Sequence, residues 1–395
     1  MKVLISGAGI AGPTLAYWLL RYGFEPTIVE KAPSLRTGGY IIDFWGIGFD
    51  VADRMGLIPD IRREGYMVRE VRVVGDDGNR IAGFPVDAVS RITMGRYVSI
   101  PRGELASIIY RTIERRIETV FNDSVAAIEQ RTDCARVRFN SGVTRDFDLV
   151  IGADGLHSQV REIAFGPEPQ FERYLGYKVA AFEVPGYRPK DDLIYVMHTE
   201  VGQQVGRFAL RGDRTIFFFI FADPSPAIPD DIDAQKHLLR EHFGTSGWEC
   251  PRILGALDAV DDFYLDRVSQ IKMGTADNSW SSSRVALVGD AASCVSLLAG
   301  QGSAIAMAAA YILAGELYRA GGDFGKAFAH YERQYKGFVQ RKQRTALKFA
   351  GTFAPKSKFS MAFRNAIMNL LRIPWIADLT IGRDLGDDFR LPDYR

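Results

Sequence analysis

The sequence has few cysteines and few histidines. Its three cysteines, Cys134, Cys250 and Cys294, form an odd and unpatterned set, which excludes a disulfide framework and favours a reducing compartment. The five histidines are scattered, and the closest pair, His237 and His242, is five positions apart. Because this spacing does not put both side chains on one face of a helix, we predict no metal site.

A secretion signal and an excess of charge of either sign are also missing. Met1 leads directly into a strand-like segment, without the charged and apolar regions of a signal peptide. Lys and Arg number 49 and Asp and Glu 48, so the net charge of +1 gives no reason to expect a nucleic-acid partner. Residues 291–315 carry no charge, but Gly300 and Gly302 interrupt them, so we interpret this run as a buried loop and helix. We expect a cytoplasmic protein with no membrane partner.

A glycine-rich motif follows the first strand-like segment, Lys2–Ser6. In Gly7-Ala-Gly9-Ile-Ala-Gly12, the first glycine permits a tight turn, the second lets a pyrophosphate approach the backbone, and the third lets helix and strand pack closely. The helix that opens here, with Ile10 and Ala11 in its first turn, supplies amide donors and positive potential for phosphates. Glu30 ends the next strand-like segment, followed by Lys31, at the place where an acid accepts hydrogen bonds from a ribose. These residues predict an adenine dinucleotide site.

Two further segments favour FAD over NAD. The strand-like segment 148–155 ends in Asp154-Gly155 and precedes Ser158 and Arg161, and the segment 284–292 ends in Gly289-Asp290-Ala-Ala and precedes Ala299-Gly-Gln-Gly302. With these motifs, the sequence resembles the class A flavin-dependent monooxygenases of the para-hydroxybenzoate hydroxylase type. The run 38–43 and the loop 299–302 are most similar to the tetracycline-inactivating branch. The resemblance covers residue 1 to about 161 and 284 to about 333.

The resemblance implies a function and a set of cofactors. It implies FAD, NAD(P)H as a transient reductant and molecular oxygen as co-substrate, with hydroxylation of an aromatic or polycyclic small molecule through a flavin hydroperoxide. The sequence has only one Gly-x-Gly-x-x-Gly motif, so a dedicated NAD(P)H domain is not expected. A non-hydroxylating FAD oxidoreductase, or an FAD-containing protein that sequesters a drug, stays open as an alternative. The protein is expected to be a monomer or a homodimer.

Further cofactor contacts are expected around these motifs. Beyond the first glycine motif, Glu30 and Lys31, the expected FAD contacts are Arg36, Gly39, Asp43, Arg102, Asp154, Gly289, Asp290, Gly300, Gly302 and Ser303.

The backbone of Gly300, Gln301 and Gly302 precedes a long helix, so we expect it to stabilise negative charge on a reduced flavin. Asp154 is expected to brace amides in its own turn or to touch substrate, and Arg161 to pair with Asp154 or to meet the nicotinamide cofactor. The sequence departs from the family at Ser293, where a His is common, and at 295–298, where many members have a Pro. Both departures concern the oxygen-reacting face.

The order of the segments predicts the domain organisation. We expect an α/β fold in which a Rossmann-like FAD-binding domain (1–70, 98–172 and 273–330) is interrupted by a β-rich substrate domain (71–97 and 173–272). The substrate domain is expected to be a mainly antiparallel sheet. Residues 331–395 are expected to form a C-terminal helical segment that packs on the body, with its basic residues on a solvated face.

Candidate substrate residues come from the β-rich region. In Phe217-Phe-Phe-Ile-Phe221, alternation puts Phe217 and Phe219 on one face and Phe218 on the other. Phe217 and Phe219 either line an aromatic substrate or form ordinary sheet core under a helix. The remaining candidates, each with a structural alternative, are Tyr195, His198, Arg211 and Asp43.

Overall fold

The computed structural model describes residues 1–35, 39–187, 189, 191–273, 279–373 and 389–394, with the side chains at 88 and 348–352 excepted. Its centre is a six-stranded sheet in the order β17-β18-β11-β1-β2-β7, parallel except for β17. The strands are β1 (Lys2–Ser6), β2 (Glu25–Glu30), β7 (Glu118–Phe121), β11 (Leu149–Gly152), β17 (Ser281–Ser282) and β18 (Val285–Leu287). The helix α1 (Ala11–Arg21) joins β1 to β2 and packs against α10 (Gly302–Arg319), which confirms the expected nucleotide-binding unit.

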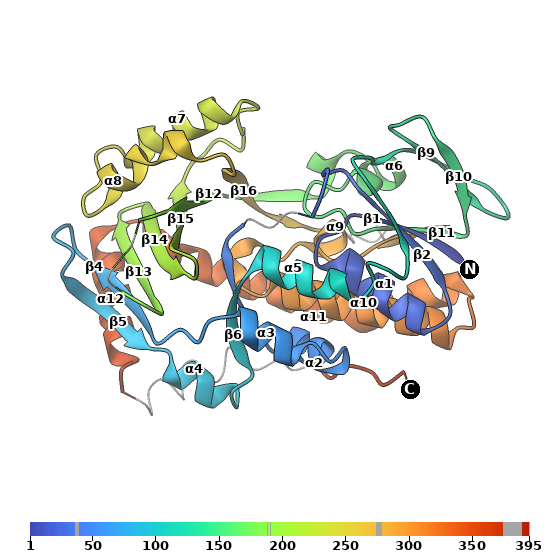
Figure 1. The fold of residues 1–395 in the computed structure, drawn as a ribbon, viewed down its shortest axis with the longest axis horizontal. Coiled ribbons are helices and arrows are strands. Elements are labelled where there is room, and N and C mark those ends of the chain that lie inside the picture. The colour runs from blue at the N-terminus through green and yellow to red at the C-terminus, as the bar shows by residue number, and fades with distance from the viewer. Residues whose placement is uncertain (36–38, 188, 190, 274–278, 374–388, 395) are drawn as a thin grey trace.

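A second, seven-stranded sheet carries the β-rich region. Its order is β16-β12-β15-β14-β13-β4-β5, and all pairs are antiparallel except β13 with β4. The strands are β4 (Glu70–Val74), β5 (Arg80–Pro85), β12 (Glu172–Pro185), β13 (Ile194–Glu200), β14 (Gln203–Leu210), β15 (Arg214–Ala222) and β16 (Tyr264–Ile271). The helices α7 (Ile232–Phe243) and α8 (Cys250–Gly255) lie over one face of this sheet (Figure 1). The predicted mainly antiparallel sheet is therefore confirmed.

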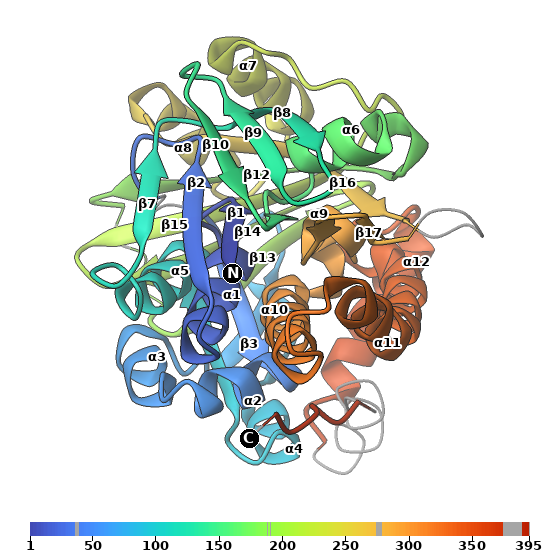
Figure 2. The ribbon, with the colours of Figure 1, turned by 90° about the vertical axis from the view of Figure 1, so that its right-hand side faces the viewer.

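A two-stranded ribbon and two long helices complete the frame of the site. The ribbon pairs β3 (Ile41–Trp45) with β6 (Tyr97–Pro101), and β6 leads directly into α5 (Arg102–Arg111). The helix α11 (Phe324–Phe353) runs beside α10 (Figure 2), and α12 (Lys358–Leu370) contacts β5 at the edge of the large sheet (Figure 1).

The other described α-helices and strands are α2 (Ile47–Arg54), α3 (Ile58–Glu64), α4 (Asp87–Ile92), β8 (Val125–Gln130), β9 (Ala135–Phe139), β10 (Thr144–Phe147), α6 (Gln159–Phe165) and α9 (Asp290–Ser293). The strands β8, β9 and β10 form a three-stranded antiparallel sheet. Within the described part of the chain, no helix combines the length and apolar character needed to cross a bilayer.

Candidate active site

The turn between β1 and α1 has room only for glycine at two positions. Gly7 has φ +106°, and a Cβ on it would lie 2.6 Å from the carbonyl oxygen of Ala153. A Cβ on Gly12 would lie 1.9 Å from the carbonyl oxygen of Gly7. Among the described residues no side chain caps α1, so the amides of its first turn, around Ile10 and Ala11, are available to an anion. This is the geometry that a dinucleotide pyrophosphate needs.

Glu30 lies at the end of β2, beside the same turn. Its carboxylate accepts hydrogen bonds from the backbone N–H of Ala8 (2.7 Å) and of Ala32 (2.9 Å). These bonds hold the acid at the edge of the glycine turn and leave further lone pairs on its two oxygens for other donors. Lys31 is exposed next to it. Arg36 lies outside the described residues.

Arg102 brings three of the predicted motifs together. Its backbone N–H donates to the carbonyl of Tyr40 (3.1 Å), and a Cβ on Gly39 would lie 3.9 Å from its Cβ. A Cβ on Gly9 would lie 3.7 Å from its Nη2, so the guanidinium reaches the glycine turn. Burial raises the pKa of Asp290, and the charge of Arg102 opposes that rise. The charge of Arg102 therefore acts on Asp290 as well as lying beside the glycine turn.

The segments around Asp290 and Gly300 are shaped by close backbone packing. Gly289 has φ +65°, and a Cβ on it would lie 3.1 Å from the Cβ of Ala11, so the Gly-Asp motif lies against α1. Gly300 also has φ +65°, and a Cβ there would lie 3.6 Å from the ring of Trp45. No described side chain caps α10, which begins at Gly302. Its positive N-terminal end is therefore open to negative charge.

The positions at which the sequence departs from the expected family pattern, Ser293 and 295–298, lie between Asp290 and Gly300. Ser293 ends α9 and is buried, as is Gln301, whereas Ser303 in the first turn of α10 is partly exposed. Ser296 has φ +89°, a region that non-glycine residues rarely adopt, and its Oγ accepts a hydrogen bond from the N–H of Leu298 (3.3 Å). The 295–298 stretch therefore bends through a serine in a strained backbone conformation.

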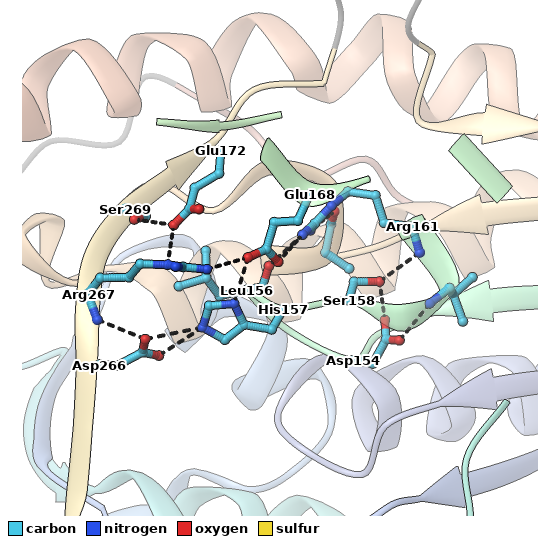
Figure 3. A network of polar contacts seen from close by, with 12 residues as sticks. Asp154, Leu156, His157, Ser158, Arg161, Glu168, Glu172, Asp266, Arg267 and Ser269 are labelled. Carbon is cyan, nitrogen blue, oxygen red and sulfur yellow. Dashed lines mark hydrogen bonds and ion pairs between the residues drawn. The ribbon is translucent and has the colours of Figure 1, made fainter. Parts of the chain in front are cut away.

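Asp154 braces its own turn. Its carboxylate accepts a hydrogen bond from the Ser158 hydroxyl (Figure 3) and another from the N–H of Val160 (3.0 Å). Arg161 is fully buried and does not use Asp154 as its ion-pair partner. It donates to the carbonyl of Ala291 (3.1 Å) and pairs with Glu168 (2.7 Å). Arg161 therefore ties the Asp-Gly turn to the Gly-Asp-Ala motif.

The network continues into the large sheet through His157. Its Nδ1 lies 2.9 Å from Glu168, and its Nε2 lies 3.1 Å from Asp266 on β16 (Figure 3). The hydrogen bonds of these two carboxylates raise the pKa of His157 to about 9. Arg267 also pairs with Glu168 (2.6 Å). Charged side chains therefore join the nucleotide-binding unit to the β-rich region.

Asp43, on β3 of the ribbon, is hydrogen-bonded to two hydroxyl groups of the neighbouring strand β6. Tyr97 and Ser99, two residues apart on β6, donate to its Oδ1 at 2.7 and 2.6 Å. Burial raises the pKa of Asp43, and these hydrogen bonds oppose the rise. Burial also raises the pKa of Tyr195 well above its usual value, and the charge of the Asp43 carboxylate adds to that rise.

Aromatic rings lie next to Arg102. The ring of Tyr40 is 6.0 Å from that of Phe218 and 6.0 Å from that of Tyr264. Tyr40 feels the charges of both Arg102 and Asp290, and burial raises the pKa of its hydroxyl to about 12. The face of the large sheet that carries Phe218 is therefore the one turned toward the cofactor motifs.

The structure corrects the assignment of Phe217 and Phe219 as substrate contacts. Both are fully buried on the opposite face, in a core cluster with residues of α7 and α8. The ring of Phe219 is 4.9 Å from that of Phe243 on α7. Phe217 and Phe219 therefore belong to the core of the sheet, which was the alternative interpretation of this run. Phe218 lies on the opposite face, which is turned toward the cofactor motifs.

His198 and Arg211 also lie away from the aromatic group. His198 opposes Val205, which opposes Phe219, so it shares the face of the sheet covered by helices, and it stacks on Trp248. Arg211 donates to the carbonyls of residues 64 (2.8 Å) and 65 (2.7 Å) and lies over the ring of Tyr66. The contacts of both side chains are therefore with neighbouring parts of the fold.

The sequence analysis missed five side chains that the structure places at the site. They are Tyr40, Tyr97, Ser99, Phe218 and Tyr264. A signal was available for two of them, because Tyr97 and Ser99 alternate with Val98 on the strand that ends just before Arg102 and therefore share a face with each other. Tyr40 lies inside the 38–43 run. Phe218 and Tyr264 had no local signal.

Comparison with known proteins gives consistent matches. The family described as FAD binding domain matches residues 1–327. A flavin-dependent monooxygenase from an unknown prokaryotic organism is 38% identical over 352 residues, covering 87% of this chain and 87% of that protein. A flavin-dependent monooxygenase of Legionella longbeachae is 32% identical over 397 residues, covering 100% and 98%. The crystal structure of tetracycline destructase Tet(51) superimposes with a TM-score of 0.83 at 33% identity, covering 100% of this chain and 99% of that one.

Proposed function

The chain belongs to the FAD binding domain family and is a flavin-dependent monooxygenase, and from this premise we propose that it hydroxylates an aromatic or polycyclic small molecule with electrons from NAD(P)H. The observation that carries the substrate class is the aromatic group Tyr40, Phe218 and Tyr264 beside Arg102. Planar rings stack on such side chains, which hold them near the cofactor motifs. Tetracycline, named for the related destructase, is one polycyclic compound to test.

The cofactor residues fit FAD, which when bound supplies the redox chemistry with oxygen. The crowded glycines and the uncapped start of α1 would hold its pyrophosphate, and Glu30 its ribose. Arg102 and Asp290 would hold the ribityl arm. The positive end of α10 at Gly302 would stabilise negative charge on the isoalloxazine ring.

The ribbon supplies a group that can move a proton. Both hydroxyl donors reach Oδ1 of Asp43, so the carboxyl can take up a proton at Oδ2. Its raised pKa brings proton uptake closer to neutral pH. We propose that Asp43 accepts a hydrogen bond, or a proton, from a hydroxyl of the substrate or from the flavin edge.

The test is oxygen-dependent NAD(P)H oxidation by the purified yellow protein, with phenols and tetracycline as substrates. We expect oxygen atoms from labelled O₂ in the product. We expect Phe218→Ala to raise KM at least tenfold without loss of FAD, because it removes a ring from this partly exposed group. The matched variant Phe217→Ala should lower stability and leave KM nearly unchanged, because Phe217 lies in the core. Product without labelled oxygen, or the reverse pattern in the two variants, would overturn the proposal.

A further inference from the structure

The helix α12 turns an apolar stripe toward solvent. The exposed fractions are 81% for Phe359, 61% for Phe363, 41% for Ile367, 48% for Leu370 and 40% for Ile373 just beyond the helix. Positions 359, 363, 367 and 370 are three or four residues apart, so their side chains share one face of the helix. A contiguous outward apolar face of this kind marks an interaction surface.

The opposite side of α12 faces the protein. Arg364 is buried, and its guanidinium donates to Oε1 of Gln204 on β14 (3.3 Å). Asn369 donates to the backbone carbonyl of Ile81 on β5 (3.2 Å). The expectation that this segment packs on the body therefore describes one face of the helix only, and these contacts orient the other face outward.

The sequence of this segment carries charge of one sign. Residues 333–373 contain ten Lys and Arg and no Asp or Glu, although the whole chain has a net charge of only +1. Lys356 and Lys358 are exposed at the start of α12, and Arg372 is exposed just after its end. A cationic segment with Phe, Ile and Leu on one helical face is the pattern of a helix that lies in a membrane interface.

We propose that α12 docks this protein on an anionic lipid surface, with Phe359 and Phe363 inserted at the headgroup boundary and the flanking cations against the lipid headgroups. The helix has 13 residues, or about 20 Å, so it lies along the surface and does not cross it. A second copy of the chain is a poorer occupant, because a symmetric contact through this face would bring two cationic segments together.

The experiment measures binding of the full-length, FAD-loaded protein to lipid vesicles by sedimentation. The vesicles are phosphatidylcholine alone or phosphatidylcholine mixed with phosphatidylglycerol. We expect binding to the anionic vesicles that weakens as salt is added. The double variant Phe359→Ser/Phe363→Ser should lower the partition coefficient about a hundredfold, because two large apolar side chains no longer enter the interface.

A matched control replaces two exposed apolar residues elsewhere. Val143 is 53% exposed between β9 and β10, and Ile232 is 48% exposed at the start of α7. Val143→Ser/Ile232→Ser should bind vesicles as the parent protein does. FAD absorbance and melting temperature should match in all three proteins. A further variant, Phe363→Trp, should show blue-shifted emission with anionic vesicles.

Three results would overturn the proposal. The first is equal binding to neutral and anionic vesicles, and the second is equal binding by the Phe359→Ser/Phe363→Ser variant and its control. The third is a dimer in light scattering that this variant converts to a monomer, which would assign the face to a second copy of the chain.

Discussion

Replacement of Arg161 by Met tests whether one buried cation holds the two cofactor motifs together. The side chain is fully buried, and it donates to the carbonyls of Leu156 (2.7 Å) and Ala291 (3.1 Å) as well as pairing with Glu168 (2.7 Å). Met fills a similar volume but supplies no donor. The two carbonyls would lose their partner, and α9, which begins at Asp290, would lose its tie to the Asp-Gly turn.

The expected loss in the free energy of unfolding depends on which ion-pair partners Glu168 keeps after the replacement. Removing one partner of a buried ion pair costs about 3–5 kcal/mol, largely because the other charge is left unpaired. Here Glu168 keeps His157 and Arg267, so we expect the lower end, about 3 kcal/mol. That is a large share of the roughly 5–15 kcal/mol that stabilises a folded domain.

The assay is urea unfolding of the apoprotein, followed by tryptophan fluorescence, together with FAD titration. We expect Arg161→Met to lower the unfolding midpoint and to weaken FAD binding at least tenfold. Arg136 pairs with Asp146 at 2.7 Å on the exposed surface, so Arg136→Met is the matched control and should change neither value measurably. An Arg161→Met protein that unfolds like the control, and binds FAD as tightly, would refute the argument.

Two further predictions concern other parts of the site. Gly12→Ala places a Cβ 1.9 Å from the carbonyl oxygen of Gly7, so we expect a colourless protein with no FAD absorbance, whereas Gly255→Ala, which meets nothing within 4 Å, should stay yellow. His157 has its pKa raised from 6.5 to about 9 in the folded protein, so its stabilising effect is complete below pH 6.5 and is lost as the pH rises through about 9. The melting temperature of His157→Gln should therefore lie below that of the parent at pH 6 and approach it at pH 10. Because this side chain is 42% exposed, solvent screening keeps the difference to a few degrees. A constant difference across this pH range would contradict the assignment.

The cofactor half of the site was predictable because its geometry is local. A pyrophosphate requires backbone amides at close approach, and only glycines at fixed spacing allow this, so Gly7, Gly9 and Gly12 identify it without any long-range information. The same holds for the turn that begins at Asp154, where the carboxylate bonds to residues four to six positions later.

The substrate side of the site depends on tertiary contacts that no local sequence pattern specifies. Alternation along β15 separated Phe218 from Phe217 and Phe219 but could not say which face meets the cofactor, because that depends on where α7 and α8 pack. Tyr40, Phe218 and Tyr264 come from three distant segments and meet only in the folded chain.

The sparse, unpatterned cysteines favoured a reducing compartment, and the glycine motif with Glu30 predicted an adenine dinucleotide site. The segments that end in Asp154-Gly155 and Gly289-Asp290, with the family resemblance that they carry, led to FAD as the expectation. The sequence by itself determined the backbone that receives the cofactor, since close approach to phosphate restricts residue type at each position. Tertiary structure alone decided which side chains face that cofactor and that α12 turns its phenylalanines outward, since burial depends on contacts between elements far apart in sequence.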